Sequence, residues 1–112
     1  MNRIMLSMLL VLVLCMPPVI ANELISPTPP GAEVYFIAPS DGQTVTSPVI
    51  VRFGLRGMGV APAGVDKEKT GHHHLLINTD IASVNMQLLL GNYLHIPHAE
   101  PVLSNAITIM VE

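Results

Sequence analysis

From residue 33 onward the chain consists of short apolar runs separated by glycine, proline and polar turn residues. Apolar and polar side chains alternate most strictly in residues 44–55, as expected of a strand with one buried face. No segment shows the 3.6-residue period of an amphipathic helix. The pattern therefore predicts five strands, at residues 33–38, 44–55, 73–78, 86–91 and 106–111.

Several short strands without helices predict an all-β domain, a small antiparallel β-sandwich or barrel. The strands at residues 73–78 and 86–91 should pair as an antiparallel hairpin because their connection is short. The apolar face of each strand should form the core, and Arg52 should face solvent. The predicted core residues are Val34, Phe36, Val49, Val51, Phe53, Leu75, Ile77, Leu88, Leu90, Ile107, Ile109 and Val111.

The first 21 residues have the pattern of a secretory signal peptide. Arg3 gives a positive start, residues 4–16 are almost wholly apolar, and Ala21 ends a Val-x-Ala sequence. The apolar run is shorter than the ~20 residues that span a bilayer, so cleavage after Ala21 should leave no stable membrane span. The predicted location is periplasmic or secreted, with a proline-rich linker at residues 22–32 and a domain at residues 33–112.

The composition of the chain after cleavage excludes several kinds of ligand and partner. Cleavage would leave 91 of the 112 residues and remove Cys15, the only cysteine, so disulfides and thiolate ligands are excluded. Loss of Arg3 changes the formal net charge from −3 to −4, and the four remaining Lys and Arg residues are scattered. Nucleic acid is therefore not an expected partner. No nucleophile motif or carboxylate pair stands out, so the chain is not expected to be an enzyme.

Histidines carry the candidate chemistry, because residues 71–78 read GHHHLLIN. Successive side chains of a strand point to opposite faces, which puts His72 and His74 on one face and His73 on the other. His95 and His98 follow the next strand, and hairpin pairing would bring them to the start of the first. Zinc and copper both favour imidazole ligands. The predicted metal ligands are His72, His74, His95 and His98, the predicted ion is Zn²⁺ or Cu²⁺, and His73 should be dispensable.

Other interpretations of the same histidines stay open. A structural interpretation has them satisfying loop backbone groups at a strand entrance, with His98 packed in a turn beside Pro97. A third interpretation is an exposed patch that responds to pH, since the reference pKa of histidine is ~6.5. Without a metal, the domain would be an interaction module that binds a protein or glycan. Uncovered sheet edges would also favour self-association.

Several motifs carry a family resemblance. Residues 39–53, PSDGQTVTSPVIVRF, resemble the opening of bacterial immunoglobulin-like domains. Together with further motifs, this stretch makes the chain resemble an exported bacterial family, the domain of unknown function 4399. Those motifs are residues 54–64, GHHHLLI at 71–77, QLLLG at 87–91 and IPH at 96–98. The resemblance implies a periplasmic immunoglobulin-like sandwich of uncharacterised role. In that family a further stretch separates the two strands that residues 79–86 join here, which predicts an internal deletion and an incomplete sandwich.

Overall fold

The computed structural model describes residues 21–112, so the predicted signal peptide lies outside the described residues except for Ala21. Within that range no helix is long and apolar enough to cross a membrane. The elements are a short 3-10 helix, η1 (Ala21–Leu24), and the strands β1 (Glu33–Ala38), β2 (Thr44–Val45), β3 (Arg52–Arg56), β4 (Gly59–Val60), β5 (Thr70–Thr79), β6 (Ser83–Gly91) and β7 (Ile107–Val111). The all-β prediction is confirmed.

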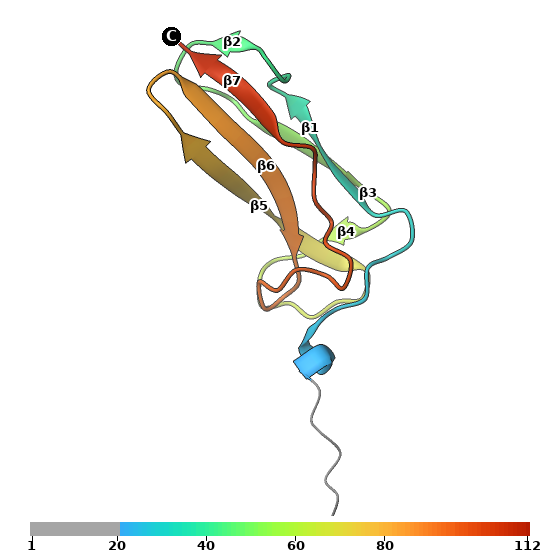
Figure 1. The fold of residues 1–112 in the computed structure, drawn as a ribbon. Coiled ribbons are helices and arrows are strands. Elements are labelled where there is room, and N and C mark those ends of the chain that lie inside the picture. Colours follow the sequence, from blue (N-terminus) through green and yellow to red (C-terminus); the bar gives the residue numbers. More distant parts are fainter. Residues whose placement is uncertain (1–20) are drawn as a thin grey trace, which may run out of the picture.

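The strands form two sheets that lie against each other (Figure 1). The smaller sheet is the antiparallel pair β1–β3, and the larger has the order β2-β7-β6-β5-β4. The β5–β6 hairpin is antiparallel as predicted, whereas β2 with β7 and β4 with β5 are parallel pairs. The larger sheet is therefore mixed, which corrects the purely antiparallel expectation.

The strand predicted at residues 44–55 is divided between the two sheets. Its first part is β2, which pairs with β7, and its last part is β3, which pairs with β1. Pro48 lies between them and has no N–H to donate to a ladder, so a continuous strand is interrupted there. The chain crosses from the larger sheet to the smaller one at this interruption.

The core lies between the sheets, where Val34 of β1 packs against Leu88 and Leu90 of β6. Of the predicted core, five residues are buried: Val34, Leu88, Leu90, Ile107 and Ile109. Met86 and Val102 are also buried and were not predicted. Phe53 and Ile77 were predicted wrongly, since they are 38% and 57% exposed. Ile77 lies near the C-terminal end of β5, where the residues of the strand are exposed.

The observed burial predicts that truncating Leu88 destabilises the domain more than truncating Phe53, although the alternation pattern placed both in the core. Leu88 is fully buried, so Leu88→Ala is expected to lower the free energy of unfolding by about 2–5 kcal/mol. Phe53→Ala should cost less than the ~3–5 kcal/mol of a fully buried phenylalanine, because its ring keeps solvent contact. Urea unfolding of both variants measures the difference. A larger loss for Phe53→Ala would contradict this description of the core.

The proline-rich segment at residues 22–32 packs against the domain, whereas an extended linker was expected. Pro29 is buried, and the backbone N–H of Ala99 donates to the carbonyl of Ser26 at 3.0 Å. The Thr28 hydroxyl donates to the carbonyl of Glu100 at 2.6 Å and accepts from its N–H at 2.8 Å. The Ser26 carbonyl and the Thr28 hydroxyl, on either side of Pro27, thus bond the segment to the loop that follows β6.

Candidate metal centre

Two histidines of β5 lie side by side on one face of the larger sheet. The register with β6 places His72 opposite Gly91 and His74 opposite Leu89, so both project to the same side. Their Nε2 atoms are 3.0 Å apart, and the ring centroids are 4.7 Å apart. The alternation of a regular strand is therefore sufficient to bring these two rings together.

His95 reaches the same point from the loop after β6. Its backbone lies in the left-handed region at φ 63°, which non-glycine residues adopt sparingly, although histidine is among the more tolerant types. Its Nδ1 atom is 3.2 Å from Nε2 of His72. One ring nitrogen each of His72, His74 and His95 lies within 4.8 Å of the others. Three of the four predicted ligands thus converge.

The spacing of these nitrogens suits a metal ion. Zinc–imidazole bonds of about 2.0–2.1 Å at tetrahedral angles put two ligand nitrogens about 3.3–3.4 Å apart. The contacts of 3.0 and 3.2 Å that His72 makes are close to that separation. The three nitrogens lie within 4.8 Å of one another, so the rings of His74 and His95 must turn toward each other to share one ion. His72 and His74 are half-buried and His95 is exposed, which leaves one side of the group open to solvent.

Gly91 makes room for the cluster. A Cβ atom there would lie 2.8 Å from Nε2 of His74 and 3.3 Å from Cα of His95. Because Gly91 is paired with His72, that Cβ would project to the face occupied by the histidine rings. Any other residue at this position would therefore displace the ring of His74.

His98 does not join the group, which corrects the predicted set of four ligands. Its side chain is only 3% exposed, and its Cε1 atom lies 3.1 Å from the place where a Cβ of Gly71 would stand. Gly71 precedes His72 on β5, so that position belongs to the opposite face of the strand. The turn between His95 and His98 therefore sends the two rings to different sides of β5.

His73 points away from the cluster, as predicted from its place in the strand. Its ring packs on Phe53 of β3 with centroids 4.5 Å apart, between the two sheets. The Nε2 atom of His73 is buried and has no hydrogen-bond partner among residues 21–112. His73 thus serves the packing of the sheets and offers no ligand to the cluster.

Burial and neighbouring imidazoles favour neutral rings. Desolvation is the main cause of a lowered pKa for His72, and the proximity of His74, His95 and His73 lowers it further. Burial also lowers the pKa of His73, opposed in part by a hydrogen bond to the backbone of Gly54. A neutral imidazole has a free nitrogen lone pair, so the lowered pKa of His72 favours ligation near neutral pH.

The same pKa changes predict that acid destabilises the metal-free protein. The pKa values of His72 and His73 in the folded state lie below their ordinary value of 6.5, so the unfolded chain takes up protons first as pH falls. The free energy of unfolding should therefore be greatest above pH 6.5 and decrease as pH falls through the folded-state values. Urea titrations at several pH values measure this. His73→Phe should flatten the dependence, and equal stability at pH 7.5 and 5 would contradict it.

Two residues that shape this site were not predicted. Gly91 could be read from the sequence only as the end of a strand, because its steric role depends on pairing with His72. Asn92 is 1% exposed and holds the loop that carries His95, with its Oδ1 accepting from the N–H groups of Leu94 and Ile96. The sequence Gly91-Asn92 after an apolar run predicts a turn, but it does not predict which groups the asparagine side chain will bond.

The fold and the cluster define a small two-sheet β-domain with three converging histidines at one end of a hairpin. The sequence model of the family described as domain of unknown function (DUF4399) matches residues 51–88, which include His72 and His74. This confirms the resemblance seen in the sequence motifs. The internal deletion stays a prediction. No curated protein and no solved structure matches the chain.

Proposed function

We propose that this chain is an exported β-domain that binds one Zn²⁺ or Cu²⁺ ion through His72, His74 and His95. The observation that carries the proposal is the convergence of three ring nitrogens from two separate segments, with contacts of 3.0 and 3.2 Å. Three imidazoles leave a further coordination position for water or another ligand. The proposed role is binding, and the expectation that the chain is not an enzyme stays a prediction.

A purely structural cluster is the competing explanation. A hydrogen-bonded trio without an ion would require the neutral rings of His74 and His95 both to donate to the single lone pair of His72 Nε2, which suits one donor well and two poorly. In that arrangement His72 must carry its own proton on Nδ1, which is buried and has no partner among the described residues. The trio therefore leaves a buried donor unsatisfied without the compensation that a metal–nitrogen bond would supply.

Calorimetric titration of the exported chain, produced without a tag, tests the proposal. Zn²⁺ and Cu²⁺ should each bind with a stoichiometry of one, and binding should be lost on acidification because protonated imidazole cannot ligate. Mg²⁺ is the control ion, since it prefers oxygen ligands. Absence of saturable binding by both transition metals would leave the structural explanation standing.

Export is part of the proposal and rests on the pattern of residues 1–21. A periplasmic or extracellular chain would acquire its metal outside the cytoplasm and would need no cysteine to hold it. The intact mass of the protein recovered from the periplasm tests export. A chain beginning at Asn22 supports it, and a chain that retains residues 1–21 contradicts it.

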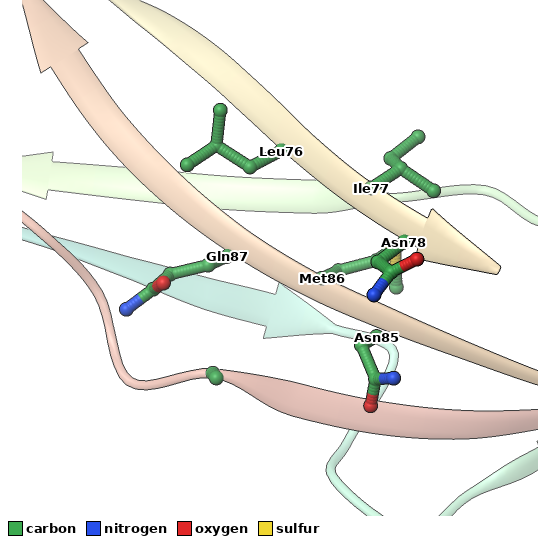
Figure 2. Close-up of a pocket in the computed structure, with 7 residues that line it drawn as sticks. Leu76, Ile77, Asn78, Asn85, Met86 and Gln87 are labelled. Carbon is green, nitrogen blue, oxygen red and sulfur yellow. The ribbon is translucent and has the colours of Figure 1, made fainter.

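Exposed apolar residues on the β5–β6 hairpin favour a second candidate function, binding of a protein partner. Leu76 and Ile77 are 45% and 57% exposed and line a pocket of about 200 Å³ (Figure 2). Beyond Gly71, β5 has no further pairing with β4, so the outer edge of the strand is open. Open edges with apolar side chains invite strand addition and self-association.

Sedimentation velocity over a wide range of protein concentration tests this second candidate. Self-association through the β5 edge predicts a sedimentation coefficient that rises with concentration, and Ile77→Lys should suppress the rise because a charge protects an open edge. Val65→Lys is the matched control, since Val65 is also exposed but lies in the loop before β5. A concentration-independent monomer would remove self-association from consideration.

A further inference from the structure

The buried side chain of Asn92 organises the loop that carries His95. Its Oδ1 atom accepts from the N–H of Leu94 at 2.9 Å and from the N–H of Ile96 at 3.1 Å. The N–H of His95 donates to the carbonyl of Asn92 at 2.9 Å. The backbone on both sides of His95 is therefore bonded to one side chain, which supports the left-handed conformation at φ 63°.

The other end of the Asn92 amide is bonded to the N-terminal segment. Its Nδ2 atom donates to the carbonyl of Leu24 at 2.9 Å and to the hydroxyl of Ser26 at 3.1 Å. Ser26 and Thr28 are in turn bonded to the backbone of Ala99 and Glu100, beyond His95 in the chain. The segment of residues 24–28 thus lies along the loop and restrains it at both ends.

We propose that Asn92 is a positioning residue of the metal centre and that it makes residues 24–28 part of that centre. This inference rests on the proposed metal binding. His95 is the one ligand of the three that a strand does not hold, so its position depends on the loop. The Oδ1 atom of Asn92 bonds the loop that carries His95, and its Nδ2 atom bonds the segment of residues 24–28. One amide group therefore links the position of His95 to the docking of the segment.

Coupling of this kind must act in both directions. If docking of residues 24–28 holds His95 in the geometry that binds metal, then metal binding must strengthen the docking by the same factor. Outer-shell partners of metal ligands typically change affinity by about 10- to 100-fold when they are removed. Asn92 contacts the backbone beside a ligand and not its ring, and an effect toward the lower end of that range is expected.

Three substitutions in the exported chain separate the two functions of the amide. Asn92→Ala removes every side-chain contact and should raise the Kd for Cu²⁺ by about 10-fold or more. Asn92→Asp keeps oxygen acceptors for Leu94 and Ile96 but has no donor for Leu24 and Ser26, so it reports on docking. Ser26→Ala removes one docking contact and leaves the loop contacts in place, and a smaller rise in Kd is expected.

Ser104→Ala is the matched control for a general loss of stability. Ser104 is also buried, and its hydroxyl accepts from the N–H of Leu88 and donates to the carbonyl of Asn105, both at 2.8 Å. These contacts stabilise a part of β6 that lies away from the histidine cluster. Ser104→Ala should lower the unfolding midpoint without changing the Kd for Cu²⁺. A rise in Kd for this control as large as for Asn92→Ala would overturn a positioning role.

Hydrogen exchange provides a readout that does not depend on whether Asn92→Ala folds. The N–H groups of Ala99 and Glu100 donate to the docked segment, so Cu²⁺ should slow their exchange in the wild type, and Ser26→Ala should weaken that effect. Unchanged exchange at both amides in a wild type that binds Cu²⁺, or an unchanged Kd in Asn92→Asp and Ser26→Ala, would overturn this inference alone. A wild type that binds neither Cu²⁺ nor Zn²⁺ would overturn the proposed function as well.

Discussion

His72→Ala/His74→Ala is expected to abolish metal binding, while His73→Ala leaves the affinity close to that of the wild type. The double substitution removes two of three ligands whose nitrogens lie within 4.8 Å of one another. The loss should exceed the about 10- to 100-fold that is typical of outer-shell substitutions. His73 lies on the opposite face against Phe53, so its removal affects packing and not coordination.

Calorimetric titration with Cu²⁺ and Zn²⁺ compares these variants with His95→Ala and His98→Ala. The structure separates the last two: His95→Ala should weaken binding strongly, and His98→Ala should not, because His98 lies outside the cluster. Urea unfolding of each variant shows whether the fold is retained. Equal weakening by His73→Ala and the His72→Ala/His74→Ala double substitution would mean that the cluster is not the binding site.

Gly91→Ala is expected to remove the metal site while largely preserving the fold. The added Cβ would meet Nε2 of His74 at 2.8 Å and Cδ2 at 3.2 Å, which are atoms at the far end of a side chain that can rotate away. Rotation of the His74 ring relieves that clash but takes its Nε2 atom away from His72. The added Cβ would also lie 3.3 Å from Cα of His95, so the loop that carries this second ligand must shift slightly. Because coordination needs the nitrogens at bond distance, we expect a loss of affinity of at least about 10-fold.

Gly59→Ala is the matched control for this substitution. Gly59 is also a strand glycine without a positive φ, and the atom nearest to its Cβ position is Cγ2 of Thr70 at 3.7 Å, an ordinary contact. Gly59→Ala should leave both the affinity and the unfolding midpoint close to those of the wild type. Wild-type affinity in Gly91→Ala would show that His74 is not a ligand in the geometry described above.

Local periodicity was sufficient to predict the elements that depend on it. The strand at residues 33–38 has the observed bounds of β1, and the hairpin of β5 and β6 followed from two apolar runs with a short connection. The faces of His72, His73 and His74 followed from alternation alone. These features need no knowledge of distant residues, because a two-residue period fixes the side of the sheet on which each side chain lies.

Features that depend on contacts between distant segments were missed. The two parallel pairs, β2 with β7 and β4 with β5, involve strands of only two residues, which are too short to show a period. His98 was placed with the cluster because it follows the same strand of the hairpin as His95, but the turn between them sends it to the other face of β5. The docking of Leu24 and Ser26 on Asn92 joins residues that are 68 and 66 positions apart in the chain.

X-ray absorption spectroscopy of zinc-loaded residues 22–112 tests the central claim most directly, because it reports the number and kind of ligand atoms around the ion. Coordination by His72, His74 and His95 predicts a first shell of about 2.0–2.1 Å with the outer-shell scattering of three imidazoles. A first shell of oxygen with one imidazole or none would contradict the proposed centre, as would a protein that retains no zinc after dialysis.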